Sequence, residues 1–514
     1  MCLYLYIATF ALLLSALYYS SQWDRSKLPL PPGPKKFPLV GNLFHIPSTF
    51  EWVTYMEWSK RYNSDILHLN VGGKSIIVLS SAESADDLLV KRAAIYSDRP
   101  RLPMVNELMS WSNGLAFMKY GDRWRTHRRL WHETFNPVAV QSFRPKLREA
   151  SHDLLRRMVR EPDGVLYHLR HMAAKIVMSV AYGINIHPSD DPYVTLADQA
   201  VHGLMTALVP GRFLVDAFPI LKYVPAWFPG ATFKRKAQEW SKLAHRMLEE
   251  PYAEAKHKIE MGTAPHSFVR EALCSLEQSE NMEYLEQAIQ ATARSMYTAG
   301  SGTTVSVLST FILAMLSNPE AQKMAQLEID TVVGQNRLPD FDDEPSLPYV
   351  SALMNEVLRW INPTPIAIPH FLASEDEYRG YRLPASSIVI ANTHAILHDE
   401  VVYPEPHTFN PERYLLDGKL NPSVPSPDIV YGFGRRICPG RHMAASSVWI
   451  TLVSILATLD ITKAVGDDGQ LLEPTCDYFA GVVVQPLPFQ CSIKPRSKEA
   501  LALIQGTAED ELLV

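Results

Sequence analysis

The sequence predicts a mainly α-helical protein with small β-sheets, organised as a single large domain behind a membrane anchor. Helical apolar patterns dominate after Leu79, and few further strands are indicated. Asp65–Leu69 and Ser75–Leu79 flank Gly72-Gly73 and are typical of a hairpin. Of the 514 residues 47% are hydrophobic, which is ample for a large core. We find no internal repeats, so one large helical domain is favoured over an array of small units.

The N-terminal stretch has the composition of a membrane anchor. Met1–Trp23 carries no charge, and Leu3–Tyr19 is nearly all apolar or aromatic, close to the roughly 20 residues that cross a bilayer. Arg25 and Lys27 follow, which places the C-terminal side in the cytoplasm by the positive-inside rule. A cleaved signal peptide is the alternative, and the lack of a positively charged start disfavours it. We therefore predict a transmembrane anchor over residues 1–22.

Proline content marks the next boundary. Leu28–Pro38 reads LPLPPGPKKFP, a composition that predicts a stiff, extended connector. We place a proline-rich hinge at residues 23–45 and the main domain at residues 46–496. The remaining tail, residues 497–514, is expected to be poorly ordered.

Charge and cysteine usage exclude several classes of protein. The formal net charge is -6 and no basic tail is present, so nucleic acid is not an expected partner. The five cysteines are widely spread, odd in number and without a Cys-x-x-Cys pair. This usage favours a reducing compartment and argues against a disulfide framework or a zinc site.

One decapeptide, Tyr431–Gly440 (YGFGRRICPG), concentrates the chemistry of the chain. Its glycines let the backbone turn tightly and approach a flat ligand closely. Cys438 stands before a predicted helix, whose N-terminus favours the metal-binding thiolate. Arg436 adds a positive charge suited to a carboxylate. A buried structural cysteine is the alternative reading.

This decapeptide resembles the haem-ligand loop of the cytochrome P-450 superfamily, Phe-x-x-Gly-x-Arg-x-Cys-x-Gly. It matches at Gly434, Arg436, Cys438 and Gly440, and it departs at Tyr431, where the family usually has Phe. The resemblance implies the haem-thiolate fold, haem b as cofactor, and iron ligated by Cys438. The two matched glycines and Arg436 are then cofactor-binding residues.

Further cofactor-binding residues are indicated elsewhere in the chain. Trp124 and Arg128 are four residues apart, which places both on one face of a helix. An indole N–H beside a guanidinium can hold a carboxylate, although a solvated basic helix face is the alternative. The pair matches the family's Trp-x-x-x-Arg, which binds the haem propionates, and His370 matches a position that reaches a propionate. Arg125 and Arg129, with nearby His127, are expected to form a basic patch for an acidic redox partner.

A long helical pattern over Ser295–Ser317 contains AGSGTT at positions 299–304. Glycines and β-branched residues weaken a helix interior and can open a kink for a small molecule or water. The stretch resembles the family's oxygen-binding groove, with Thr303 and Thr304 as the catalytic hydroxyl residues. Gly302 stands where the family has an acid, which predicts proton delivery by water or another donor. Helix packing through small residues is the alternative.

A charged cluster is predicted to brace the segment that leads to the cysteine loop. Glu356 and Arg359 form the only Glu-x-x-Arg in the chain, and this spacing lets the side chains meet on a helix. Arg413 resembles the third member of the family's Glu-Arg-Arg cluster. We interpret its role as structural, because a glutamate shared by two arginines fixes a segment rigidly.

The resemblance implies a haem-thiolate monooxygenase that uses O2 and electrons from NADPH through a cytochrome P-450 reductase. No Gly-x-Gly-x-x-Gly fingerprint or cysteine cluster is present, so electrons must come from another protein. The family's membrane-bound members predict a single-pass protein of the endoplasmic reticulum with its catalytic domain in the cytoplasm.

The substrate region points to fungal secondary metabolism. The proline-broken apolar loop in Val209–Lys236 suits either the membrane interface or the core. This loop and Val105–Met109 look most like a mushroom branch of the family. We expect a small lipophilic metabolite as substrate, with a terpenoid preferred. Gly302 also allows a haem-thiolate desaturase or rearrangement enzyme, and a non-catalytic haem sensor is the third hypothesis.

Overall fold

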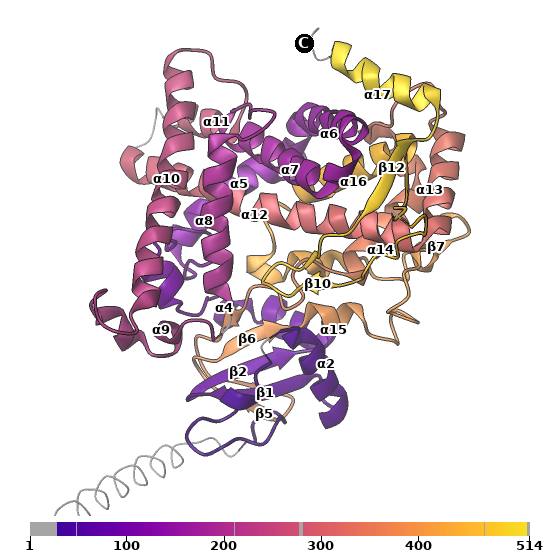
Figure 1. The fold of residues 1–514 in the computed structure, drawn as a ribbon. Helices are drawn as coiled ribbons and strands as arrows, with labels where there is room; N and C mark the ends of the chain where they lie inside the picture. Colours follow the sequence, from indigo (N-terminus) through magenta and orange to yellow (C-terminus); the bar gives the residue numbers. More distant parts are fainter. Residues whose placement is uncertain (1–27, 48, 210, 277–280, 467, 511–514) are drawn as a thin grey trace, which may run out of the picture.

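The computed structural model describes residues 28–510, except residues 48, 210, 277–280 and 467. A large helical body carries a smaller β-sheet region at one end (Figure 1). This architecture confirms the predicted mainly α fold. The predicted anchor over residues 1–22 lies outside the described residues.

The helices follow the apolar periodicity of the sequence, and the longest cross the body of the protein. The α-helices are α2 (Glu51–Tyr62), α3 (Ala82–Ala85), α4 (Ala93–Tyr96), α5 (Asp122–Phe135), α6 (Arg144–Arg160), α7 (Val165–Tyr182), α8 (Pro192–Leu208), α9 (Leu214–Ala217), α10 (Thr232–Glu260), α11 (Phe268–Cys274), α12 (Met282–Ser317), α13 (Pro319–Val332), α14 (Pro348–Trp360), α15 (Thr393–Leu397), α16 (Arg441–Thr458) and α17 (Lys498–Asp510).

The strands form one four-stranded sheet of order β1-β2-β6-β3 and several two-stranded ribbons. The strands are β1 (Ile66–Val71), β2 (Lys74–Leu79), β3 (His370–Phe371), β4 (Asp376–Tyr378), β5 (Tyr381–Leu383), β6 (Ile388–Ala391), β7 (Leu415–Leu416), β8 (Lys419–Leu420), β9 (Leu459–Lys463), β10 (Tyr478–Phe479), β11 (Gln485–Pro486) and β12 (Cys491–Pro495).

The predicted hairpin is confirmed, and its turn depends on two glycines. Val71 pairs with Lys74, so Gly72 and Gly73 alone make the turn between β1 and β2. Both have positive φ angles, of 55° and 87°, which a two-residue hairpin turn requires and glycine adopts without strain. β6 then joins β2 in parallel, and β3 joins β6 antiparallel.

Helices α12 and α16 form the centre of the core. Every residue of α12 from Thr304 to Leu316 is buried. α16 is apolar on all sides, as expected of a fully enclosed helix. Among the helices that the structure describes, α12 alone is long and apolar enough to cross a membrane. However, 67% of its most apolar 18-residue window is buried within the fold.

The C-terminal segment differs from the expected poorly ordered tail. Residues 498–510 form α17, which docks on α6 (Figure 1). Ile504 is 1% exposed, and Arg156 Nη1 donates to Thr507 Oγ1 at 2.7 Å. Terminal position alone therefore misled the prediction, because an apolar stripe ties this segment to the core.

The docking of α17 can be tested with Ile504→Ala. Loss of this buried side chain should cost about 2 kcal/mol or more and release α17 from α6. We expect faster tryptic cleavage at Lys498 in the variant. Gln505→Ala, a truncation at the exposed neighbouring position, is the matched control and should leave cleavage unchanged. Equal cleavage in both variants would show that α17 does not depend on this contact.

Candidate active site

The cysteine loop is closed on itself before α16 begins. The Cys438 backbone N–H donates to the carbonyl oxygen of Tyr431 at 2.7 Å, across a turn in which Gly432 has a φ of 84°. Gly434 also has a positive φ, and a Cβ there would lie 2.2 Å from the carbonyl oxygen of Leu89. Only glycine fits at that position, which explains the match at Gly434 in the motif.

The surroundings of Cys438 prepare it for a metal. Burial raises the pKa of the thiol, while the Gly440 backbone N–H and the charges of Arg128 and Arg441 oppose that rise. An uncoordinated Cys438 is therefore neutral at pH 7. A bound cation removes the thiol proton outright, so the thiolate is expected only with iron in place.

Arg436 and the two predicted residues of α5 meet at this loop. The Arg436 guanidinium lies 4.7 Å from the ring of Trp124 and donates to three backbone carbonyls, including that of Ser97 at 2.7 Å. Arg128 Nη1 donates to the carbonyl oxygen of Ile437 at 2.6 Å. The structure thus brings Arg436 together with Trp124 and Arg128, which lie far from it in the sequence.

Arg99 is a site residue that the sequence did not reveal. It is 7% exposed, and its Nη1 donates to the carbonyl oxygens of Ile368 and Pro369 at 2.6 and 2.8 Å. Burial and the nearby Arg436 hold the pKa of Arg99 well below its usual value. Arg99 lies in an irregular segment without a motif, so only its proximity to Arg436 identifies it.

These buried arginines have no carboxylate partner among the residues that the structure describes. Burial is also the main cause of the lowered pKa values of Arg128 and Arg436, the latter to about 10. Asp98 is close, but its Oδ1 accepts the backbone N–H groups of Arg99 and Tyr120. Uncompensated buried positive charge is costly, so the site fits an anionic group such as the propionates of haem.

His370 joins the cluster in an unexpected state. Its Nδ1 lies 2.8 Å from the carbonyl oxygen of Tyr96, and burial together with Arg99 lowers its pKa well below the usual value. A neutral ring with its proton on Nδ1 has no donor left at Nε2. A nearby carboxylate would favour the protonated ring, which could then donate from Nε2.

The groove residues lie on one uninterrupted helix. α12 continues through positions 299–304 without the break that glycines can allow. Thr303 Oγ1 donates to the carbonyl oxygen of Ala299 at 2.8 Å, and Thr304 is 8% exposed. A Cβ on Gly302 would meet no atom within 4 Å, so open space remains where the family has its acid.

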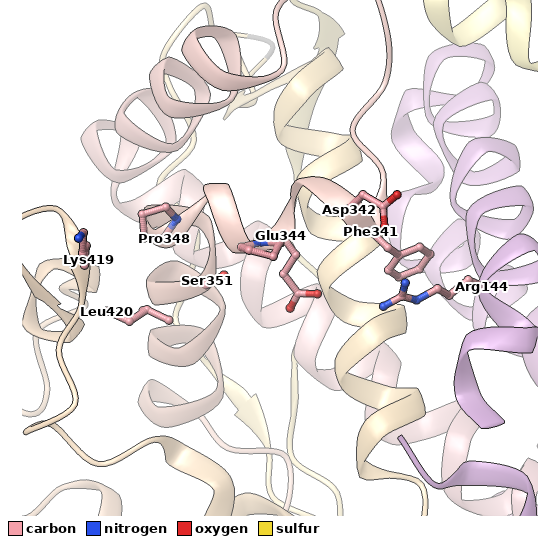
Figure 2. Close-up of a pocket in the computed structure, with 9 residues that line it drawn as sticks. Arg144, Phe341, Asp342, Glu344, Pro348, Ser351, Lys419 and Leu420 are labelled. Carbon is pink, nitrogen blue, oxygen red and sulfur yellow. The ribbon is translucent and has the colours of Figure 1, made fainter. Parts of the chain in front are cut away.

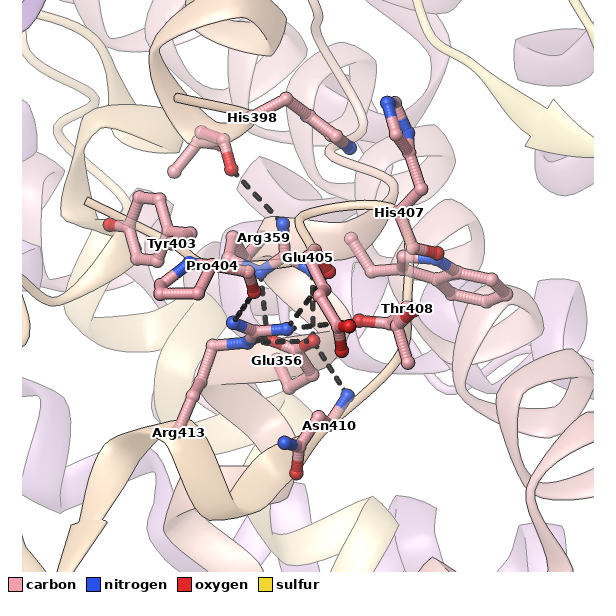
Figure 3. A network of polar contacts seen from close by, with 12 residues as sticks. Glu356, Arg359, His398, Tyr403, Pro404, Glu405, His407, Thr408, Asn410 and Arg413 are labelled. Carbon is pink, nitrogen blue, oxygen red and sulfur yellow. Dashed lines mark hydrogen bonds and ion pairs between the residues drawn. The ribbon is translucent and has the colours of Figure 1, made fainter. Parts of the chain in front are cut away.

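The predicted Glu-Arg-Arg cluster forms as expected (Figure 3). Glu356 and Arg359 are fully buried, and two hydrogen bonds of 2.7 and 2.8 Å join them. Arg413 Nε donates to the same carboxylate at 3.1 Å. The other N–H groups of the two arginines donate to backbone carbonyls, among them that of Leu397. The network ties α14 to the segment that precedes the cysteine loop.

The basic surface of α5 does not include His127, contrary to the prediction. Arg123, Arg125 and Arg129 are exposed. His127 is instead 2% exposed, with Nδ1 3.2 Å from Thr292 Oγ1, and burial lowers its pKa to about 4. His127 is therefore a neutral core residue rather than part of a charged patch.

A hollow of about 690 Å³ lies apart from these residues (Figure 2). The Arg144 guanidinium stacks at 4.7 Å over Phe341 on one side, and β8 borders the other side. No residue that lines the hollow belongs to the cysteine loop or to positions 299–304 of α12. We therefore do not include it in the candidate active site.

Comparison with known proteins defines the class of this site. The family model described as Cytochrome P450 matches residues 31–493. The chain belongs to the cytochrome P450 family, and it is an oxidoreductase whose haem iron is bound through a cysteine thiolate.

Fungal relatives are similar over nearly the whole chain. Cytochrome P450 monooxygenase 98 of Postia placenta is 44% identical, covering 97% of this chain and 96% of the relative. Cytochrome P450 monooxygenase ple1 of Rhodocybe pseudopiperita is 42% identical (95% and 94%). Tryptamine 4-monooxygenase of Psilocybe cyanescens is 40% identical (96% and 98%).

The buried network gives a direct stability prediction. Glu356→Gln keeps the shape but leaves the charges of Arg359 and Arg413 unpaired, which should cost about 3–5 kcal/mol. We expect a lower midpoint of urea unfolding and a smaller fraction of protein that retains haem. Glu400→Gln is the control, because that carboxylate pairs with Lys60 in solvent, where ion pairs contribute about 0–1 kcal/mol. Similar losses in both variants would contradict the assigned role.

Proposed function

We propose that the protein is a membrane-anchored monooxygenase that hydroxylates a small lipophilic secondary metabolite, with a terpenoid preferred. In this proposal Cys438 ligates the iron of haem b, and NADPH supplies electrons through a cytochrome P450 reductase. The observation that carries the proposal is a set of arginines near Cys438 whose hydrogen bonds, within residues 28–510 as described, go to backbone carbonyls and not to carboxylates. The carboxylates of an anionic porphyrin would pair with these guanidinium groups.

Each site residue then has a distinct task. When bound, haem supplies reductive activation of O2. Arg436, Arg128 and Arg99 hold its carboxylates, and Trp124 packs against the guanidinium of Arg436. Gly434 and Gly440 keep the loop close to the cofactor. Thr303 would supply the hydroxyl that assists proton delivery to bound O2, and Thr304 anchors the helix in the core.

An exposed basic face supports docking of a reductase. Arg123, Arg125 and Arg129 project from α5, the same helix that presents Trp124 and Arg128 to the cysteine loop. A partner with an acidic surface would therefore bind on the helix whose Trp124 and Arg128 contact the cysteine loop. Such charge pairing raises the rate of association more than it raises the affinity of the complex.

Two apolar segments support membrane contact. Phe218, Ile220, Tyr223 and Trp227 are 56–78% exposed around α9 and the short helix Pro219–Tyr223. Residues 37–44 also expose aromatic and aliphatic side chains. Both segments adjoin the β1–β2 turn, because Gly41 bridges Val71 and Lys74 Nζ donates to the carbonyl oxygen of Asp216. Exposed apolar side chains thus lie on two segments next to the same turn, as expected for contact with a lipid interface.

The thiolate assignment is tested by Cys438→Ser. The variant should lose the reduced carbon-monoxide spectrum typical of thiolate haem, because a serine hydroxyl does not replace the thiolate donor. Cys491→Ser is the control and should keep that spectrum. A thiolate spectrum retained by Cys438→Ser would assign the ligand to another cysteine.

The reaction class is tested by supplying isotopically labelled O2 to the full-length protein with reductase and NADPH. Tryptamine and a bicyclic sesquiterpene alcohol are the two probes, and metabolite profiling of an expressing host extends the search. Label in a product supports hydroxylation. A product without label favours the desaturase or rearrangement alternative, for which the absent acid at Gly302 is the motive. A reduced carbon-monoxide spectrum typical of thiolate haem, without any reductase-supported product across the profile, would favour the non-catalytic alternative.

Membrane contact is tested by hydrogen exchange of the full chain in lipid nanodiscs and in detergent-free amphipol. We expect backbone amides of residues 218–228 to exchange more slowly in the bilayer, since lipid shields them from water. Val401, which is 91% exposed and outside this face, marks the control segment. Equal exchange of residues 218–228 in both media would place this loop away from the membrane.

A further inference from the structure

A glutamine side chain contacts the helix backbone at Gly302. Gln485 Nε2 donates to the carbonyl oxygen of Gly302 at 3.1 Å. Gln485 belongs to β11, more than 180 positions along the chain from the helix that it contacts. Gly302 is the position at which the family carries an acid, and the Gln485 amide donates a hydrogen bond to the backbone there.

The placement of Gln485 is fixed by its neighbour rather than by its own side chain. The Val484 backbone N–H donates to the carbonyl oxygen of Pro363 at 2.9 Å, and the Val484 carbonyl oxygen accepts the hydroxyl of Ser306. These two backbone anchors hold β11 against α12. The Gln485 amide is therefore held over Gly302 by contacts outside the groove.

The amide has capacity left for a further partner. One of its two N–H groups serves the Gly302 carbonyl, and no hydrogen bond from the described part of the chain reaches Oε1. Gln485 is half-buried, and Oε1 is not among the enclosed atoms that lack a partner. Because a Cβ on Gly302 would meet nothing within 4 Å, there is room for water beside the residue to which the amide donates.

We propose that Gln485 is a positioning residue for proton delivery to the oxygen-binding side, resting on the monooxygenase function proposed above. Its amide orients a water beside Gly302, and that water donates to the Thr303 hydroxyl. Thr303 Oγ1 already donates to Ala299, so its oxygen still accepts a hydrogen bond. The amide does not titrate; the proton comes from solvent through water, and Gln485 only fixes the path.

The test uses the full-length protein with reductase and NADPH, without substrate. With efficient proton delivery, one O2 and two NADPH, with two protons, give two waters and two NADP⁺. With poor delivery, one O2 and one NADPH, with one proton, give hydrogen peroxide and NADP⁺. Gln485→Leu keeps the bulk but removes the amide, so peroxide released per NADPH should rise about fivefold, the weight of one lost hydrogen bond.

A second readout does not depend on turnover. Cyanide bound to ferric haem accepts hydrogen bonds from the same side, so its dissociation constant in Gln485→Leu should rise by a similar factor, about fivefold. Adding Gly302→Asp to Gln485→Leu places a carboxylate in the open space and should lower peroxide release again. Gln485→Glu, a near-isosteric acid, should keep peroxide release low and make it depend on pH.

Gln290→Leu is the matched control, because it removes an amide of α12 that also donates to a backbone carbonyl, that of Leu248, away from Gly302. It should leave peroxide release and cyanide binding near the wild-type values. Unchanged peroxide release in Gln485→Leu, or an equal rise in Gln290→Leu, would overturn the proposal. Failure of the proposed function is distinct, since the wild-type protein would then show no thiolate spectrum or no NADPH consumption.

Discussion

Uncompensated positive charge beneath the surface is the constraint on which the candidate active site depends. Arg99 and Arg436 are buried and Arg128 is half-buried, and backbone carbonyls rather than carboxylates accept their hydrogen bonds. Those carbonyls belong to the cysteine loop itself and to segments far before it in the sequence, so the arginines determine how the segments meet. Because buried charge without a counter-ion is costly, an anionic cofactor would stabilise the folded state as it binds. Folding and cofactor binding are therefore coupled through these arginines.

The Glu356 network shows the opposite arrangement on the far side of the same segment. There, one carboxylate accepts from Arg359, from Arg413 and from the backbone N–H of Asn410 at 2.8 Å. Every charge in this network has a partner inside the protein, so it requires no ligand and can act as a permanent brace. The cysteine loop thus lies between a complete network that holds its approach and an incomplete one that awaits an anion. The presence or absence of a carboxylate partner therefore distinguishes structural from cofactor-binding arginines better than the burial of the side chains does.

The sequence predicted the parts of the site that depend on local spacing. Trp124 with Arg128, and Glu356 with Arg359, were found because a helix fixes which residues share a face. Arg99 and Gln485 were missed, because each acts through backbone carbonyls of segments distant in the sequence, and such contacts leave no pattern. His127 was assigned to a charged patch because helix periodicity alone could not show that its side chain turns toward Thr292. Position in the chain misled the prediction for α17, whose apolar stripe outweighs its terminal location.

Gly302 also takes part in a contact between segments that are far apart in the sequence. In an α-helix the carbonyl at one position normally serves only the N–H four residues later, and a second acceptor site on that oxygen stays open. Gln485 occupies that second site, while a Cβ at position 302 would meet no atom within 4 Å. In the proposed arrangement the carboxylate of the family is replaced by a neutral group held from outside the helix. A neutral amide keeps its hydrogen bonds at every pH, whereas a carboxylate in the same place would lose its charge in acid. Proton delivery in this chain should accordingly follow the protonation of solvent and not that of a local side chain.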